Sequence, residues 1–258
     1  MGRLKMDGTG LAWRVEEACL NAWPAVRQAL FGGWVLRVSG GLTRRANSAN
    51  PLGVERAGRD MLIAGCEAFY HHHRLPTIFR LPSLIGSEID ERLADRGYGA
   101  EGTSLVLCGE IGTVPALHDP DVRLLARPTT RWFAAMAALQ GLSKEQAALY
   151  RRIVGALAIP ARFAVHAENG AIAALAFGAI HDGIICYESV VSDPQRRRRG
   201  YARRVIASLA AWARERGAQH ACLEVEAANA PALALYAALG FEELYRYHYR
   251  RGPSPDRR

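Results

Sequence analysis

The segment around residues 190–204 carries the groups best suited to chemistry. An apolar stretch ends at Ser192, Asp193-Pro194 follows, and six arginines lie among residues 196–204. The pattern after Gly200 predicts a helix, and a helix start presents unpaired N–H groups and a positive dipole end. Such an end binds phosphate oxygens, and Gly200 and Ala202 would let a pyrophosphate approach the backbone closely. The segment is therefore predicted to be a phosphate-binding loop, with a solvated basic helix start as the alternative.

Two short signatures stand in the second half of the chain. Residues 197–202 read Arg-Arg-Arg-Gly-Tyr-Ala and follow Pro194, and residues 229–241 read Asn-Ala-Pro-Ala-Leu-Ala-Leu-Tyr-Ala-Ala-Leu-Gly-Phe. They resemble the two signatures of the GNAT superfamily of acyl-CoA-dependent N-acetyltransferases. These are the Arg/Gln-x-x-Gly-x-Gly/Ala loop, usually preceded by proline, and Asn-x-x-Ala-x-x-Leu-Tyr-x-x-x-Gly-Phe. The resemblance covers about residues 120–250, roughly half of the chain.

In proteins of this family acetyl-CoA lies where two neighbouring parallel strands part. The resemblance therefore implies a gap between residues 184–192 and 220–227, with acetyl-CoA as co-substrate and no metal. Loop amides would hold the pyrophosphate, basic side chains would meet the 3′-phosphate, and Asn229 would contact the pantetheine arm. The cofactor-binding residues expected on this basis are Val190, Val191, Ser192, Arg197, Arg198, Arg199, Gly200, Tyr201, Ala202, Arg203, Asn229 and Tyr236.

The resemblance further implies that Tyr236 protonates the departing CoA thiolate. A neutral amine would attack the thioester carbonyl, and a strand N–H near Val191 would stabilise the tetrahedral oxyanion. The thiolate then benefits from a positioned acid. The alternative for Tyr236 is an ordinary aromatic side chain of the core.

The general base is left open. Some family members carry a carboxylate on the strand before the phosphate loop, where this chain has Glu188. Cys186, Glu188 and Val190 are expected on one face of that strand because side chains alternate. A carboxylate within an apolar run needs water, a partner or a function. Glu188 is the leading prediction for the base, against a structural ion pair, and Glu224, Glu226 and bulk water are the alternatives.

The elements that must position these residues predict an α/β protein with a mixed sheet, and the resemblance implies the GNAT fold. Hydrophobic periodicity and turn residues define the expected elements. Helices are expected over residues 12–31, 54–73, 87–95, 132–139, 144–158, 200–216 and 231–239. Strands are expected over residues 34–39, 42–49, 77–81, 104–108, 122–126, 162–167, 171–180, 184–192, 220–227 and 243–250.

The two halves of the chain share an order of elements, and Leu93–Tyr98 aligns with Tyr236–Phe241. We therefore expect a tandem of two GNAT-like halves, of which only the C-terminal one is complete. Residues 1–118 would form a degenerate N-terminal domain, residues 119–250 the catalytic GNAT domain, and residues 251–258 a flexible tail. Chance similarity of two αβ units is the alternative.

The first half departs from the family pattern. Residues 50–53, Asn-Pro-Leu-Gly, stand where a phosphate loop would lie but lack its spacing, and Leu93 occupies the position of Tyr236. The expected role of this half is to pack on the catalytic half and to form one wall of the acceptor cleft. The polar segment Thr43–Asn50 is either an acceptor contact or an ordinary hydrogen-bonded strand end.

Composition further limits the classes of protein to which the chain could belong. Half of the 258 residues are hydrophobic, and no apolar run of membrane-spanning length or signal-peptide core is present. Residues 1–120 hold 13 basic and 13 acidic residues, and residues 121–258 hold 20 and 12, so the net charge of +8 lies in the second half. The five cysteines form no CxxC pair and are expected to be buried and reduced in a cytoplasmic protein. Consecutive helical residues such as His71–His73 point apart and do not converge on a metal.

The sequence therefore predicts an enzyme, a cytoplasmic N-acetyltransferase that transfers an acetyl group from acetyl-CoA to a primary amine by direct attack in a ternary complex. A small-molecule amine is the leading expected acceptor, followed by a protein amine. No nucleic-acid or membrane partner is expected, and a monomer and a homodimer are both compatible with the sequence. Two alternatives are a non-catalytic acyl-CoA-binding regulatory protein and a nucleic-acid binder that uses the arginines of residues 196–204.

Overall fold

Helices and strands alternate throughout the computed structural model, which describes residues 8–54 and 56–253. The helices are α1 (Gly8–Ala22), α2 (Arg59–His72), α3 (Glu88–Asp95), α4 (Thr130–Gln140), α5 (Lys144–Gly155), η1 (Pro194–Arg196, a 3₁₀ turn), α6 (Tyr201–Arg214) and α7 (Ala230–Ala237). The strands are β1 (Arg27–Phe31), β2 (Trp34–Val38), β3 (Ala49–Pro51), β4 (Ile78–Pro82), β5 (Gly99–Glu110), β6 (Val122–Leu125), β7 (Ala161–Glu168), β8 (Ala171–His181), β9 (Ile184–Ser192), β10 (His220–Glu226) and β11 (Glu242–Arg251).

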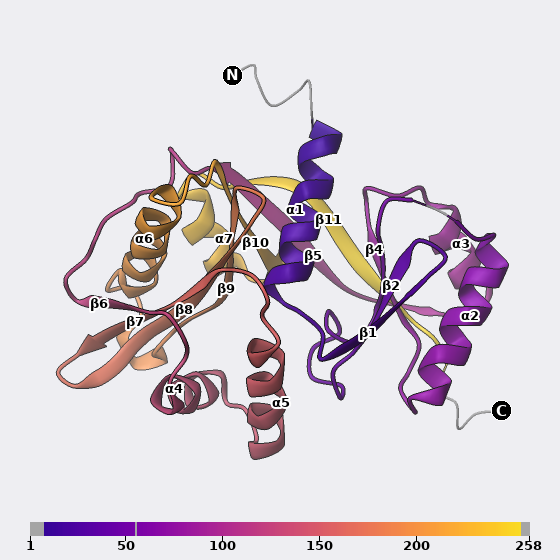
Figure 1. The fold of residues 1–258 in the computed structure, drawn as a ribbon, viewed down its shortest axis with the longest axis horizontal. Helices are drawn as coiled ribbons and strands as arrows, with labels where there is room; N and C mark the ends of the chain where they lie inside the picture. Colours follow the sequence, from indigo (N-terminus) through magenta and orange to yellow (C-terminus); the bar gives the residue numbers. More distant parts are fainter. Residues whose placement is uncertain (1–7, 55, 254–258) are drawn as a thin grey trace.

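All the strands form one sheet, in the order β1-β2-β3-β4-β11-β5-β10-β9-β8-β7-β6. The pairs β3/β4 and β9/β10 are parallel, and the other neighbours are antiparallel. The predicted α/β fold with a mixed sheet is therefore confirmed. α6 and α1 cover opposite faces of its second half, and α2 and α3 lie beside its first half (Figure 1).

The two halves exchange strands at the centre of the sheet. β5, which ends the first half, lies between β10 and β11 of the second half. β11 in turn lies between β4 and β5 of the first half. In Figure 1 these two long strands cross the middle of the molecule and join its two sides. Each half thus completes its part of the sheet with a strand from the other.

The two halves also share one topology. The series β1-β2-β3-α2-β4-α3-β5 has the same pairing pattern as β7-β8-β9-α6-β10-α7-β11. The short helices α3 and α7 end in the same way, because Tyr98 donates to the Leu93 carbonyl (3.0 Å) and Phe241 donates to the Tyr236 carbonyl (3.1 Å). The glycine before each aromatic residue has a positive φ, 79° and 86°, as this helix ending requires.

Both faces of the second half's strands are buried. On one face, α6 presents Val205, Leu209 and Trp212 to a core that includes Tyr187 of β9. On the other face lies α1, which packs on β8, β9 and β10 although it begins the chain. The N-terminal helix therefore covers strands that are far from it in sequence.

The expected domain boundary between residues 118 and 119 stays a prediction.

Three expected elements of the first half differ from the observed ones. The helix expected over residues 12–31 ends at Ala22, since Pro24 disfavours helix at the preceding residue, and β1 follows. The strand expected over residues 42–49 is a loop, and β3 begins only at Ala49. The helix expected from residue 54 begins at Arg59. Both expected helices extend beyond the helix that forms, whereas residues 42–49 are mainly polar and form no strand before Ala49.

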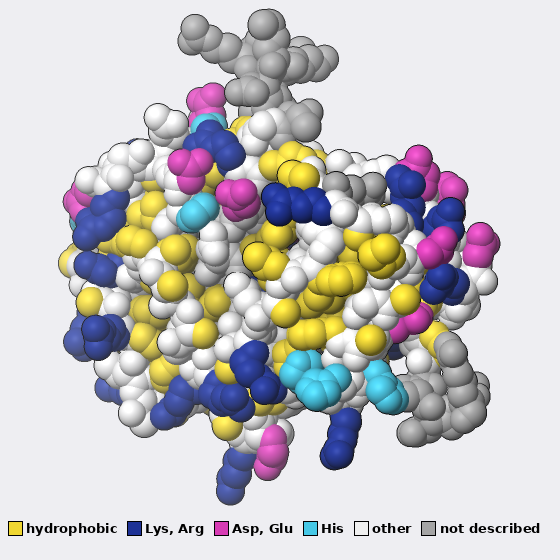
Figure 2. Space-filling view, turned by 45° about the vertical axis from the view of Figure 1, so that its right-hand side comes forward, with side chains coloured by type: hydrophobic (Ala, Val, Ile, Leu, Met, Phe, Trp, Pro, Cys, Tyr) yellow, Lys and Arg dark blue, Asp and Glu magenta, His cyan; other side chains and the backbone are white. Residues whose placement is uncertain are grey.

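The surface reflects the uneven charge of the sequence. In Figure 2 basic side chains gather along the left-hand edge and the lower margin, while apolar side chains gather over the middle of this face. No helix in the described ranges is long and apolar enough to cross a membrane. β11 extends to Arg251, at the start of the expected tail. Residues 254–258 of that tail, and residues 1–7 at the expected leaderless N-terminus, lie outside the described residues.

Candidate active site

The expected gap lies between β9 and β10. These parallel strands are paired in register from Ile184–His220 to Tyr187–Leu223, and no pairing continues beyond that point. The backbone of β9 from Glu188 onward therefore has no strand partner on its β10 side. A parting of parallel strands beside the start of a helix leaves polar backbone groups free to bind a ligand.

A β-bulge interrupts β9 at the mouth of this gap. Glu188 pairs with Phe177 and Val191 with Leu175, so two residues of β9 oppose one residue of β8. Ser189 within the bulge has a φ of 53°, and its hydroxyl accepts a hydrogen bond from Tyr150 (2.7 Å) on α5. Bulges of this kind redirect side chains next to functional sites.

The bulge corrects one expectation about β9. Cys186, Glu188 and Val190 do not share one face, because Val190 packs with the core under α6 whereas Cys186 lies in the core under α1. The extra residue in the bulge breaks the strict alternation on which the expectation rested. Val191 packs toward the core under α4 and α5, and Ser192 ends the strand half-buried.

The backbone before α6 has a row of free donors. Asp193 accepts the Gln195 amide (2.9 Å) and so shapes the 3₁₀ turn, and Gly200 begins α6 at a φ of 77° that favours glycine. Within the described part of the chain, the amides of residues 197–203 donate to no acceptor. A Cβ at Gly200 would meet no atom within 4 Å, so the space in front of the loop is open. This arrangement suits an anion.

The six arginines of the loop divide into two groups. Arg196 and Arg199 both contact Glu168 (3.3 Å), and Arg204 is paired with Asp119 (2.5 Å). These ion pairs tie the loop to β7 and to the segment before β6. The other three are exposed and have no hydrogen bond or ion pair to the described residues: Arg197, Arg198 and Arg203.

Tyr201 and Ala202 form the first turn of α6. The hydroxyl of Tyr201 donates to Glu168, and its ring stacks on His166 with 4.4 Å between ring centroids. The Tyr201 side chain is therefore buried in the protein, and only its backbone amide is available to a ligand. Ala202 is half-buried and adds no bulk to the loop.

Tyr236 and Asn229 lie at opposite ends of α7. Burial and then the negative charge of Glu188 raise the pKa of Tyr236 to about 12, so its hydroxyl stays protonated at neutral pH. Asn229 is the N-cap of α7, where its Oδ1 accepts the Ala232 amide (3.2 Å). The side-chain amide group of Asn229 has no acceptor among the described residues and is exposed.

The three carboxylates considered for the base have different surroundings. Both oxygens of Glu188 accept hydrogen bonds from Arg45, at 2.7 Å and 2.8 Å. Glu224 is buried between Arg80 (2.8 Å) and Arg45. Glu226, at the end of β10, is exposed. The ion-pair alternative for Glu188 is thus observed, while its role as base stays a prediction.

The two arginines that meet these carboxylates were not anticipated. Arg80 interrupts an apolar strand, Ile-Phe-Arg-Leu-Pro, in the same way as Glu188 interrupts its own. A charge inside an apolar strand was therefore a usable signal for a buried partner. Arg45 lies in the polar segment Thr43–Asn50, for which the sequence predicted an acceptor contact or a hydrogen-bonded strand end, without a carboxylate partner for this residue.

The sequence also gave no sign of a cluster of three cysteines. Cys19 of α1 lies 3.9 Å from Cys222 of β10 and 3.8 Å from Cys186 of β9, measured between sulfur atoms. All five cysteines of the chain are buried and form no disulfide. These three sulfurs form the one group of potential metal ligands found in the described residues, and His71–His73 belong to none. The expectation of no metal stays a prediction.

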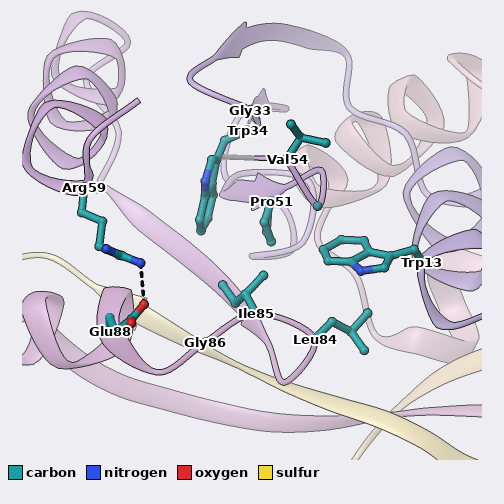
Figure 3. A pocket seen from close by; sticks show the side chains of 11 residues that line it. Trp13, Gly33, Trp34, Pro51, Val54, Arg59, Leu84, Ile85, Gly86 and Glu88 are labelled. Carbon is teal, nitrogen blue, oxygen red and sulfur yellow. Dashed lines mark hydrogen bonds and ion pairs between the residues drawn. The ribbon is translucent and has the colours of Figure 1, made fainter. Parts of the chain in front are cut away.

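The first half has a counterpart of the gap without its basic loop. β3 and β4 are paired only at Ala49–Phe79 and then part. A cavity of about 300 Å³ lies there, with an Arg59–Glu88 ion pair at one end (Figure 3). Its apolar lining includes Trp13, Trp34, Pro51, Val54, Leu84 and Ile85. No run of arginines like that of residues 196–204 follows β3.

Comparisons with known proteins extend along nearly the whole chain. A family model described as "Probable histone acetyltransferase Rv0428c C-terminal" matches residues 12–250. The "Uncharacterized N-acetyltransferase YobR" of Bacillus subtilis is 27% identical over 241 residues, which cover 92% of this chain and 97% of that protein. The [ribosomal protein bS18]-alanine N-acetyltransferase of Escherichia coli is 36% identical over 76 residues, covering 30% of this chain and 51% of that protein.

Solved structures share the fold at low sequence identity. A GCN5-related N-acetyltransferase from Kribbella flavida has a TM-score of 0.66 and 17% identity, covering 98% of this chain and 96% of that one. A tandem GNAT protein from the clavulanic acid biosynthesis pathway has a TM-score of 0.64 and 16% identity, covering 98% and 97%. The likeness therefore includes both halves of the chain.

Proposed function

The chain is a GNAT-family N-acetyltransferase of the Rv0428c C-terminal family, and from that premise we propose that it transfers an acetyl group from acetyl-CoA to a primary amine by direct attack in a ternary complex. The observation that carries this proposal is the row of free amides over residues 197–203 beside the gap between β9 and β10. Free N–H groups at a helix start suit a pyrophosphate, and parted strands suit an extended arm that carries amides.

We assign cofactor contacts in keeping with these surroundings. The amides from Arg197 to Arg203, including those of Arg199, Gly200, Tyr201 and Ala202, bind the pyrophosphate. The free side chains of Arg197, Arg198 and Arg203 are the donors for the 3′-phosphate. Asn229 binds the pantetheine arm through its side-chain nitrogen while its oxygen caps α7. The unpaired edge of β9 at Val190, Val191 and Ser192 receives the thioester end.

The proposed reaction needs no covalent enzyme intermediate. The nitrogen of a neutral amine forms a bond to the thioester carbonyl carbon, and an N–H near Val191 stabilises the oxyanion. The C–S bond then breaks, and the Tyr236 hydroxyl gives its proton to the CoA thiolate. The nitrogen loses its extra proton to water, and Tyr236 regains a proton from solvent, so the products are the N-acetylated amine and CoA. The buried, protonated state of Tyr236 supports its role as the acid.

For the base we propose water. Glu188 would have to weaken a bidentate contact with Arg45 before it could receive an ammonium proton, and Glu224 is enclosed by two arginines. Glu188 as the base remains the competing prediction. For the acceptor we propose a primary amine, with a small molecule as the leading class and a protein amine as the second.

Calorimetric titration of acetyl-CoA tests the cofactor site. We expect binding of one molecule per chain in the micromolar range, and loss of binding in Gly200→Glu because the variant places an anion among the phosphate donors. Arg197→Gln/Arg203→Gln leaves the backbone of the loop unchanged and should weaken binding about tenfold or more. Arg152→Gln removes an exposed arginine of α5 and is the matched control. Undiminished binding in both folded loop variants would refute the proposed site.

A further inference from the structure

An arginine of the first half lies where β9 and β10 part. The last paired residues of these strands are Tyr187 and Leu223, and the next residues are Glu188 and Glu224. The guanidinium of Arg45 contacts both carboxylates, donating to the two oxygens of Glu188 at 2.7 Å and 2.8 Å. The three side chains are 15%, 6% and 4% exposed. One buried cation therefore bridges the two strands at the origin of the gap.

The loop that carries Arg45 is held in place independently of this contact. Asn47 Oδ1 accepts the amides of Ser39 (2.7 Å) and Gly41 (3.0 Å), and its Nδ2 donates to two carbonyls of the same loop. The buried Arg37 donates to the Arg45 carbonyl (3.2 Å). The guanidinium of Arg45 is thus presented to the gap by a prearranged backbone.

The two carboxylates depend on Arg45 to different degrees. Glu224 has a second cation, Arg80 (2.8 Å), which is also paired with the buried Glu16. Glu188 has no other basic partner within the described part of the chain. Removal of Arg45 would therefore leave the charge of Glu188 uncompensated in a buried position.

We propose that Arg45 is a positioning residue which the first half contributes to the active site, where it holds the origin of the gap and neutralises Glu188. This inference rests on the proposed function. Negative charge develops on the oxyanion and on the leaving thiolate, so an uncompensated carboxylate beside them opposes the transition state. The negative charge of Glu188 also acts on Tyr236, the proposed acid, because it contributes to the raised pKa of that side chain. The proposed phosphate donors lie in residues 197–203, which Arg45 does not contact. We therefore expect loss of Arg45 to slow the chemical step and not to weaken acetyl-CoA binding.

The test compares steady-state kinetics and acetyl-CoA affinity in matched variants. Arg45→Met should lower kcat at least about tenfold while the Kd for acetyl-CoA changes less than about threefold. Arg45→Met/Glu188→Gln removes both charges of the pair and should restore kcat to within about threefold of the wild type. Arg14→Met removes an arginine of α1 whose partner is Asp182 (2.6 Å) and should leave kcat unchanged.

Each outcome has a definite meaning. An Arg45→Met variant with undiminished kcat refutes the proposal, and so does a folded double variant that is as slow as Arg45→Met. If Arg45→Met alone does not fold, the double variant and the charge-conserving Arg45→Lys decide, since both are expected to be active. A wild-type protein that binds acetyl-CoA but acetylates no amine refutes the proposed function itself, and the role of Arg45 in that reaction with it.

Discussion

At the scale of single residues, Glu188 illustrates what a sequence can predict about a buried charge. A carboxylate inside an apolar strand must have a partner, and that much was predictable. The partner, Arg45, is 143 positions away in sequence and belongs to the other half of the chain. No local pattern joins the two. Tyr236, by contrast, could be identified as a candidate site residue from its signature alone, because the motif defines both its helix and its position before Gly240.

The protonation state of Tyr236 leads to a prediction about pH. In the proposed mechanism the protonated form of Tyr236 is the active one, and it persists below a pKa of about 12. We therefore expect kcat to show no decline from this group up to about pH 10.5, where an ordinary tyrosine would already be largely ionised. Tyr236→Phe should lower kcat about 100-fold and leave the Kd for acetyl-CoA within about twofold. A decline of the wild-type rate centred near pH 10 that disappears in Tyr236→Phe would contradict this.

At the scale of elements, the sequence predicted best what is local. The order of helices and strands around the proposed phosphate loop, and the hairpins of β7, β8 and β9, followed from turn residues and alternation. The bulge at Ser189 did not, because no local pattern marks it; the Ser189 hydroxyl contacts Tyr150 of α5, which is 39 positions away in sequence. The exchange of β5 and β11 could not be predicted from the sequence either. Strands with the same hydrophobic pattern pair equally well with a neighbour that is near or distant in sequence.

The strand exchange predicts that the halves fold together. A fragment of residues 119–258 lacks β5, so β10 and β11 would keep unpaired edges, and it lacks α1, so the apolar face around Cys186 and Cys222 would be exposed. We expect this fragment to aggregate when produced alone and to recover acetyl-CoA binding when produced together with residues 1–118. The full chain should unfold in one cooperative transition by circular dichroism. A fragment 119–258 that melts cooperatively and binds acetyl-CoA by itself would contradict the coupling.

At the scale of the whole molecule, the two halves share one topology but differ in the residues around the gap between their parallel strands, β3 and β4 in the first half and β9 and β10 in the second. The second half has the free amides and the exposed arginines that suit phosphate. The first half has a cavity lined by apolar side chains and an Arg59–Glu88 ion pair, with no run of arginines after β3, and it contributes α1, β5 and Arg45 to its neighbour. The sequence predicted this asymmetry from the spacing of its motifs. It could not predict that the supporting half completes the sheet of the other.

The most direct test of the central claim is amine-dependent acetyl transfer by the full chain. Purified protein is incubated with acetyl-CoA and a panel of primary amines, both small molecules and lysine-containing peptides, and CoA release and product mass are measured together. We predict that CoA is released in step with formation of an N-acetylated product for at least one amine, and that Tyr236→Phe slows both equally. Acetyl-CoA binding without any amine-dependent CoA release would contradict the enzymatic function and favour a regulatory acyl-CoA-binding protein.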